Sequence, residues 1–324
     1  MSQDVLNALL AVGTVFLIAN TMYALLIWVE RRGLALVQDR RGPNRVGPLG
    51  LGIVIVDTIK IFTKEDWTPP FADKSVFTLA PLLALGVPLM AVGLIPFSDL
   101  IHVWHTDVGL LMFLAFSAVG AYAVILAGWA SNNKYSLLGG LRATAQLISY
   151  EVFMGLSMLG PAMLADSFDL AEIVRWQASH GWNVLWQAPS LVLFFIAALA
   201  ETHRAPFDLP EAESEIVAGF HSEYSGIKFG MFFLAEYVGV FLMSCMMTTL
   251  WLGGADGPWV PGVHWFMLKT FLFIGLFILI RAALPRPRHD QLLAWGWKYL
   301  FPAALLNLLA VGAVVIALSQ GGAA

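Results

Sequence analysis

Three ionisable residues stand inside apolar stretches of this 324-residue sequence. Glu151, Glu236 and Lys269 each lie within a hydrophobic run that is long enough to cross a bilayer. A charge in the middle of a membrane costs roughly 2.5 to 3.5 kcal/mol, so such residues normally face a polar interior and serve a purpose. Two roles fit Glu151 and Glu236: proton transfer, or an ion pair that joins helices. Lys269 lies near the end of its run and can also extend its amine to the membrane surface.

A second group of acids lies in the segment 201–226, which begins where an apolar run ends. Apolar residues and prolines alternate with these acids, so we expect the segment to pack at the membrane surface. Carboxylates held close together raise one another's proton affinity and respond to any nearby charge. This chemistry suits a proton relay or a coupling switch, and a solvated acidic loop is the alternative. The six acids are Glu201, Asp208, Glu211, Glu213, Glu215 and Glu223.

Arginines flank the first and the last long loop, and guanidinium groups are suited to buried or interfacial carboxylates. The loops are therefore predicted to form one polar cavity at the cytoplasmic side. The arginines concerned are Arg31, Arg32, Arg40, Arg41, Arg45, Arg281, Arg286 and Arg288.

The remaining reactive residues exclude several kinds of chemistry. Cys245 is the only cysteine, so the chain forms no internal disulfide and cannot by itself hold an iron-sulfur cluster, which usually needs four thiolates. The histidines lie in polar segments or at the start of an apolar run, where they are badly placed for a haem inside the membrane. No phosphate-binding motif for nucleotides is present. We expect no metal site and no nucleic-acid partner, and any redox centre must belong to another chain.

The elements that position these residues follow from composition. Hydrophobic residues make up 59% of the chain and charged residues 12%, far below the roughly 25% that is usual in soluble domains. A membrane-spanning helix takes about 20 apolar residues. The sequence therefore predicts an all-α integral membrane protein, with one polytopic domain over residues 1–324 and about eight transmembrane helices. The predicted spans are 5–29, 77–97, 108–130, 146–165, 182–200, 229–252, 264–284 and 299–318.

The distribution of basic residues predicts the orientation. All but two of the 18 lysine and arginine residues, Arg175 and Lys269 being the exceptions, fall in the loops after the odd-numbered spans. These loops then face the cytoplasm, and both termini lie on the other side. Two of the loops, 31–76 and 201–228, are too long to be simple connections. The first contains an apolar stretch at 53–63 that predicts a short interfacial or re-entrant helix.

Several long motifs resemble those of the H subunit of respiratory complex I, the proton-pumping NADH:quinone oxidoreductase, which is called subunit 1 in mitochondria. The resemblance covers nearly the whole chain. The motifs are Glu30-Arg31-Arg32, Arg41 to Gly47, Gly128 to Tyr135, Glu201 to Asp208, Glu211 to Glu215, Ala235-Glu236-Tyr237 and Arg286 to Gln291.

The resemblance implies an eight-helix subunit of the membrane arm, next to the peripheral arm, that forms part of the quinone-binding chamber. The chamber residues that it implies are Glu30, Arg31, Asp57, Phe233, Arg286 and Arg288. An acidic proton-coupling path is implied for Glu151, Glu201, Glu211, Glu213, Glu236 and Tyr237. His289 stands where the family has a tyrosine.

The same resemblance implies the partners and cofactors. Quinone is the substrate, bound at the interface with soluble subunits, while FMN and the iron-sulfur clusters belong to partner subunits of the peripheral arm. Other membrane-arm subunits and the lipid bilayer surround the chain, in a bacterial inner membrane or its mitochondrial equivalent.

Other classes of protein fit part of the pattern. A stand-alone proton or ion transporter also uses carboxylates within the membrane, although we find no internal repeat and the loops are unusually long. A membrane anchor without chemistry would leave Glu151 and Glu236 unexplained. A hydrogenase-type relative of complex I uses a similar membrane subunit.

Overall fold

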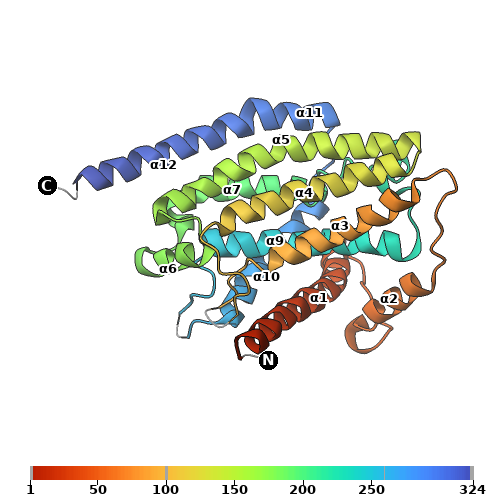
Figure 1. Cartoon of the computed structure of the whole chain (residues 1–324), viewed down its shortest axis with the longest axis horizontal. Coiled ribbons are helices and arrows are strands. Elements are labelled where there is room, and N and C mark those ends of the chain that lie inside the picture. The colour runs from red at the N-terminus through yellow and green to blue at the C-terminus, as the bar shows by residue number, and fades with distance from the viewer. Residues whose placement is uncertain (1–2, 99–100, 259, 322–324) are drawn as a thin grey trace.

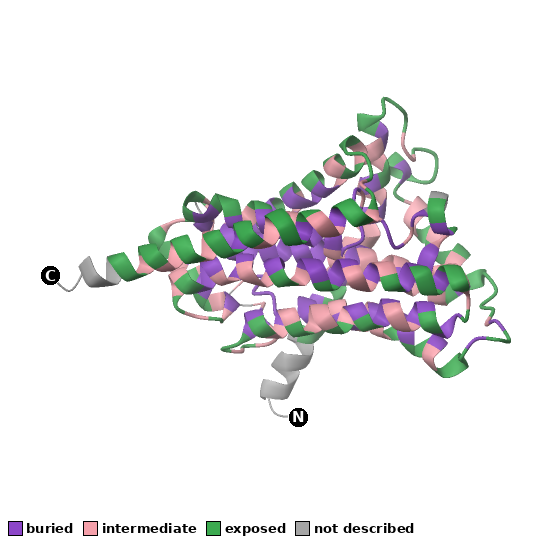
Figure 2. Ribbon diagram, turned by 90° about the horizontal axis from the view of Figure 1, so that it is seen from above, coloured by how far each residue is buried: buried purple, intermediate pink, exposed green. Residues whose placement is uncertain are grey.

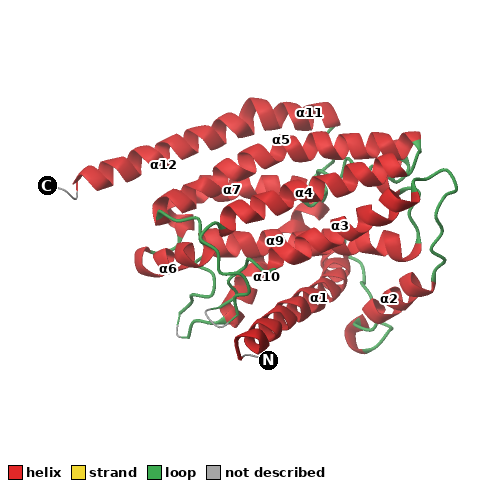
Figure 3. Cartoon of the chain, viewed as in Figure 1, coloured by secondary structure: helices red, strands yellow, loops and turns green. Residues whose placement is uncertain are grey.

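The computed structural model describes residues 3–98, 101–258 and 260–321, and the side chains of residues 3–11, 213–214 and 318–321 are outside that description. Helices provide the regular structure of these residues, and no strand occurs among them (Figure 3). One isolated β-bridge joins Ser98 and Ile101.

Within the described residues, eight spans are long and apolar enough to cross a membrane. The predicted class, an all-α integral membrane protein, is confirmed. The spans lie side by side in one bundle, and the C-terminal helix extends beyond its neighbours (Figure 1). They are α1 (Gln3–Val37), α3 (Lys74–Val92), α4 (Gly109–Ala130), α5 (Lys134–Ala165), α7 (Asn183–Glu201), α9 (Gly226–Trp251), α10 (Val263–Ala283) and a last span of α11 (His289–Trp295), the π-helical turn Gly296–Leu300 and α12 (Phe301–Gly321).

Four spans differ from the predicted bounds by five residues or more. Helix α3 ends at Val92 instead of residue 97, and the last span begins at His289 instead of residue 299. The other two differences concern α1 and α5. Helix α1 continues to Val37, so Arg31 belongs to a helix and the first long loop begins after Val37. Helix α5 begins at Lys134, before the predicted start at 146. Its first turns contain glycines and polar residues, which lower the local hydropathy without preventing a helix. Glu151 therefore lies near the middle of a 32-residue helix.

The early start of α5 has local causes. The side-chain oxygen of Asn133 accepts a hydrogen bond from the backbone N–H of Tyr135 at 2.9 Å and caps the helix. One guanidinium nitrogen of Arg142 lies 2.6 Å from a carboxylate oxygen of Glu215, so the charged first turns are paired with the long loop that follows α7.

Shorter helices lie outside the spans. Helix α2 (Ile53–Thr63) coincides with the short helix predicted at 53–63, contains no buried residue and lies beside the bundle (Figure 1). Helix α6 (Leu170–His180) was not predicted, because it is amphipathic and polar overall. The carboxylate of Asp169 caps it by accepting the backbone N–H of Ala171 at 2.9 Å. Helix α8 (Glu213–Ile216) and two short 3₁₀ helices, Pro48–Gly50 and Gly219–His221, complete the set.

The loops after α1, α4, α7 and α10 gather at one end of the bundle, as alternation of eight spans requires. Hydrogen bonds and an ion pair connect them directly. The connecting pairs are Asn132 to the carbonyl of Phe71 at 3.3 Å, Asn133 to Glu223 at 2.6 Å and Arg286 to Asp208 at 2.6 Å. We call this end the loop end.

The hydrophobic core lies around α9, the most buried of the spans. In its most apolar stretch 61% of the residues are buried, compared with 6% in the last span. Figure 2 shows the buried residues concentrated in the central helices, while exposed residues predominate on the C-terminal helix. The side chains that position the candidate site come from this centre and from the loop end.

Helices α4 and α5 approach each other closely through Gly128 and Gly140. A methyl group on Gly128 would lie 2.6 Å from the carbonyl oxygen of Ser136 and 3.3 Å from the Cα of Gly140. Small residues permit such contact between helices in a membrane. This contact fixes the position of α4 against α5, and each of these two helices contributes a residue to the inner part of the site described below.

We predict that Gly128→Ala destabilises the protein, because the added methyl group has no space. Overpacking of this kind costs about 1–3 kcal/mol. Gly86 in α3 is the matched control, since a methyl group there has nothing within 4 Å. The measurement is the midpoint of thermal unfolding of the purified protein. Equal midpoints for Gly128→Ala and Gly86→Ala would refute the close contact.

Candidate functional site

Arg204 lies in the loop after α7 and is only 6% exposed. Its Nη1 donates to both carboxylate oxygens of Glu30 on α1, at 2.8 and 2.9 Å. Its Nε lies 3.4 Å from a carboxylate oxygen of Glu236 on α9. Its guanidinium carbon lies 4.4 Å from the ring centre of Tyr237, within the range of a cation–π contact. One side chain thus joins α1, α9 and the loop.

The charges around Arg204 are balanced. Glu30 also pairs with Arg281 on α10, so this buried carboxylate contacts two guanidinium groups. Burial opposes the charge on Arg204, but the neighbouring Glu236 and other acidic groups outweigh it and raise the pKa of Arg204. The guanidinium stays ionised, and its position is set by carboxylates from two helices.

A cavity of about 350 Å³ lies beside this cluster, and we call it the outer cavity. It brings together residues of α1, α9, α10 and the long loop after α7. The lining residues are Glu30, Arg31, Leu34, His203, Arg204, Ala205, Asp208, Glu211, His221, Phe229, Phe232, Phe233, Glu236, Tyr237 and Arg281.

Ion pairs surround the outer cavity. Arg31 on α1 lies 2.7 Å from Asp57 on α2, which connects the short helix to the first span. Asp208, which lines the cavity, pairs with Arg286 at 2.6 Å. Arg288, in contrast, has a side chain that is 78% exposed, pairs with Asp290 and is not among the lining residues.

A second acidic cluster lies deeper in the bundle. The hydroxyl of Ser117 on α4 donates to Glu201, the last residue of α7, at 2.5 Å. The same hydroxyl oxygen lies 3.4 Å from a carboxylate oxygen of Glu151 on α5. Three different helices therefore bring two carboxyl groups to one hydroxyl group.

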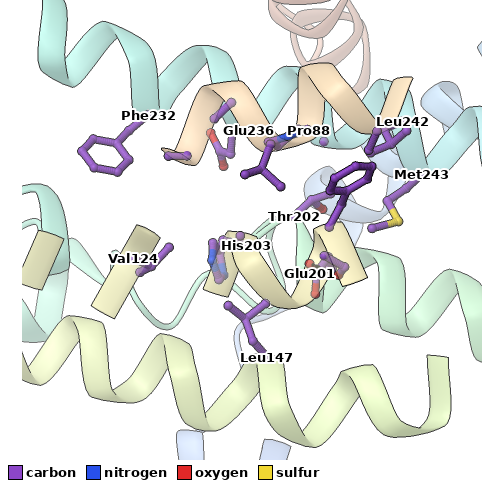
Figure 4. A pocket seen from close by; sticks show the side chains of 18 of the residues that line it. Pro88, Val124, Leu147, Glu201, Thr202, His203, Phe232, Glu236, Leu242 and Met243 are labelled. Atoms are coloured by element: carbon purple, nitrogen blue, oxygen red, sulfur yellow. Dashed lines mark hydrogen bonds between the residues drawn. The ribbon is translucent and has the colours of Figure 1, made fainter. Parts of the chain in front are cut away.

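A smaller cavity of about 110 Å³ adjoins this cluster, and we call it the inner cavity. Figure 4 shows Glu201, His203 and Glu236 among the side chains around it. Its other lining is mostly apolar and comes chiefly from α3, α4 and α9, with Leu147 of α5 and residues of the loop after α7. Four residues line both cavities, so these form the wall between them: His203, Glu211, Phe232 and Glu236.

Two histidines lie among these acids. His203 is 9% exposed and its Nδ1 is buried without a hydrogen-bond partner. The Nδ1 of His221 lies 3.8 Å from a carboxylate oxygen of Glu211. Burial lowers the pKa of each imidazole to about 4, so both rings are neutral near pH 7. A neutral imidazole has one nitrogen that donates a hydrogen bond and one that accepts a hydrogen bond.

The structure thus gathers most of the acids that the sequence selects. Glu30, Glu211, Glu236 and Tyr237 line the outer cavity, and Glu201 lines the inner cavity. Glu151 reaches the inner cluster through Ser117. The side chain of Glu213 lies outside the described residues.

Three members of the site were missed as site residues: Arg204, His203 and Ser117. Arg204 and His203 stand in the segment after α7, where the acids drew attention instead. Arg281 was predicted to contribute to the polar cavity and does line it, but its pairing with Glu30 was not predicted. Ser117 gives no signal in the sequence, because a single serine in an apolar helix usually bonds to its own backbone.

Fold and site together define a polytopic membrane protein whose charged interior opens toward the loop end. Among the described residues no group of three or more histidine, cysteine or acidic side chains is arranged to hold a metal ion.

Comparison with known proteins identifies the family. Residues 10–312 match the family model described as NADH dehydrogenase. The chain is 57% identical over 292 residues to the H subunit of the NADH-quinone oxidoreductase of Methylococcus capsulatus (strain ATCC 33009 / NCIMB 11132 / Bath), an alignment that covers 90% of this chain and 92% of the relative. The chain belongs to this family of NADH-quinone oxidoreductase H subunits.

We predict that Arg204→Ala strongly destabilises the protein. Removing one partner of a buried ion pair costs about 3–5 kcal/mol, because the remaining charges stay buried. Arg175→Ala is the matched control, because the side chain of Arg175 is exposed and its ion pair with Asp169 is long, at 3.8 Å. The measurement is the midpoint of thermal unfolding. The double variant Glu30→Gln/Arg204→Gln should recover part of the loss; equal midpoints for Arg204→Ala and Arg175→Ala would contradict the analysis.

A second prediction concerns acid stability. An unfolded histidine has a pKa of about 6.5, whereas His203 and His221 have pKa values of about 4 when folded. The unfolded chain therefore binds more protons in this range, and stability falls as the pH drops from about 6.5 toward 4. Glu211, Glu236 and Arg204 line the outer cavity together with both rings, so the contribution of the imidazoles is measured as the difference in slope between variants.

Thermal unfolding between about pH 7 and pH 5 tests this prediction. The double variant His203→Asn/His221→Asn should show a shallower loss of stability, while His180→Asn, at an exposed histidine, should keep the full slope. An unchanged slope in the double variant would show that these rings are not buried as neutral groups.

Proposed function

We propose that this chain forms the membrane part of the quinone-binding chamber of an NADH:quinone oxidoreductase and the beginning of its acidic proton-coupling path. The observation that carries the proposal is the shared wall between the two cavities. His203, Glu211 and Glu236 face both the outer cavity and the inner cavity. A change of charge in one cavity is therefore separated from the other cavity by only one side chain.

The lining of the outer cavity suits a quinone head group. Arg31 can donate hydrogen bonds to a quinone oxygen, and Phe233 and Tyr237 offer aromatic faces, with ring centres 5.1 Å apart. Glu30 holds the cationic side of the cavity in place. Asp57 and Arg286 position Arg31 and Asp208 through ion pairs. We also assign Arg288 to the chamber, where its exposed side chain would complete the lining next to a partner subunit.

Quinone reduction takes two electrons and two protons. We propose that the electrons come from peripheral-arm partner subunits, which carry the FMN and the iron-sulfur clusters. The residues around the two cavities act on the protons of the reaction. Negative charge that develops in the outer cavity attracts protons to the acids of the shared wall, and protons then redistribute toward Glu201 and Glu151 and onward to other membrane-arm subunits.

The orientation follows from the loop end. We propose that this end, which carries the basic loops, α2 and the acidic segment, faces the cytoplasm and the peripheral arm. Both termini then lie on the opposite side of the inner membrane. The name of the 57% identical relative favours NADH over the electron donor of a hydrogenase-type complex.

We predict that Glu201→Gln within the assembled complex lowers both quinone reduction and proton pumping. Glutamine has nearly the same shape but cannot accept a proton, so the path is interrupted between the inner cavity and Ser117. We expect turnover to fall by about tenfold or more, as for loss of a proton-transfer group. The measurements are quinone-reductase turnover and proton uptake by vesicles that contain the complex.

Glu172→Gln is the matched control, because Glu172 lies on the exposed face of α6. It should leave turnover and pumping unchanged. Full pumping at normal turnover in Glu201→Gln would remove Glu201 from the path. Proton movement by this chain alone, purified without its partners, would favour a stand-alone transporter instead.

A further inference from the structure

The proposed path requires a connection between Glu201 and Glu151, and a serine lies between them. Ser117 is part-buried on α4 and lines the inner cavity together with Glu201. Its hydroxyl oxygen is 2.5 Å from Oε1 of Glu201 and 3.4 Å from Oε1 of Glu151. Ser244, a serine buried within another span, donates instead to the carbonyl oxygen of Val240 in its own helix.

The two separations from the Ser117 oxygen correspond to hydrogen bonds of different strength. A separation of 2.5 Å is typical of a hydroxyl group that donates to an ionised carboxylate. A separation of 3.4 Å is longer than an ordinary O–H···O hydrogen bond and leaves Glu151 within a small movement of contact. The shorter separation favours Glu201 as the acceptor of the single hydroxyl proton of Ser117, while Glu151 faces the same hydroxyl oxygen at the longer distance.

A hydroxyl group has one proton and two acceptor lone pairs. It can bond to both carboxyl groups at once only if one of them supplies a proton of its own. In the arrangement in which Ser117 bonds to both groups and Glu201 is its acceptor, Glu151 is the member that supplies the second proton. Two ionised carboxylates around one hydroxyl would repel each other and leave Glu151 without a hydrogen bond from Ser117.

We propose that Ser117 is a proton-carrying residue that joins Glu201 and Glu151 and holds the pair with one shared proton. In the transfer step the carboxyl proton of Glu151 moves to the oxygen of Ser117, and the original hydroxyl proton moves to Glu201. One O–H bond breaks and one forms at the serine oxygen, so the serine is unchanged. The reverse sequence carries a proton from Glu201 to Glu151.

The inner cavity supplies the connection to the rest of the path. The second carboxylate oxygen of Glu201, Oε2, is buried without a protein hydrogen-bond partner. A cavity of about 110 Å³ next to it has space for several water molecules. Its polar lining includes His203 and Glu236, which also face the outer cavity. Protons that reach the inner cavity thus meet Glu201 on one side and leave through Ser117 on the other.

This inference rests on the proposed proton-coupling function, and a set of three substitutions tests it in the assembled complex. Ser117→Ala removes the hydroxyl group, and we expect quinone-coupled turnover and pumping to fall by about tenfold. Ser117→Thr keeps the hydroxyl group, so its activity should stay clearly above that of Ser117→Ala. Ser179→Ala, at an exposed serine of α6, controls for loss of a hydroxyl group elsewhere.

Infrared spectroscopy provides a readout that does not depend on turnover. A protonated carboxyl group has a C=O stretch distinct from that of a carboxylate. One such band should disappear in Glu151→Gln and shift in Ser117→Ala, while Ser179→Ala should leave it unchanged. Absence of that band from the native complex would overturn the shared proton.

The activity results separate this inference from the proposed function. Normal turnover and pumping in Ser117→Ala, together with a clear loss in Glu201→Gln, would remove Ser117 from a path that still stands. Normal behaviour of Glu201→Gln would overturn the path itself. Equal losses in Ser117→Ala and Ser117→Thr would show that the site needs the size of serine rather than its proton.

Discussion

A guanidinium group that is buried between helices must be surrounded by carboxylates, because an uncompensated charge in a low-dielectric interior costs several kcal/mol. Arg204 satisfies this condition through Glu30 on α1 and Glu236 on α9. Those helices are far apart in the sequence, so the ion pairs fix their relative position at the loop end. The loop that carries Arg204 also carries His203, Asp208 and Glu211, all of which line the outer cavity. The shape of the site therefore depends on where Arg204 is held.

The same rule has a different solution at the opposite end of the bundle. The ammonium group of Lys269 donates to the backbone carbonyls of Leu252 at 2.6 Å and Gly254 at 3.1 Å, and also to that of Asp256. Its nitrogen lies 4.7 Å from the ring centre of Trp182. These carbonyls belong to the turn that follows α9, and a cation at that position is also favoured by the dipole of the helix. Lys269 thus stabilises the turn after α9, apart from the acids that gather around the two cavities.

Composition was sufficient to predict the class of fold, since eight apolar runs can only be eight helices in a membrane. The bounds of α1 and α5 were less accessible, because polar residues paired across the loop end, such as Arg142 with Glu215, read as loop residues in a single sequence. The acids of the site could be predicted from the sequence, because a charged residue in an apolar run is energetically unfavourable unless it has a role. The partners of these acids could not be predicted, because the contacts of Arg281 with Glu30 and of Ser117 with Glu201 join residues that are remote in the chain. Pairing of this kind is decided by packing, which leaves no periodic signal.

In the function that we propose, this chain acts through the position of its charges and protons, and distance is the deciding quantity. The interaction of two charges grows as their separation and the local dielectric constant fall. Between the outer and inner cavities stands a wall of single side chains, two of them the acids Glu211 and Glu236. A charge created on one side acts through this wall on groups that are shielded from bulk water. The coupling that we propose needs no large movement of the helices, because a proton that changes its carboxyl group already alters the field on the other side.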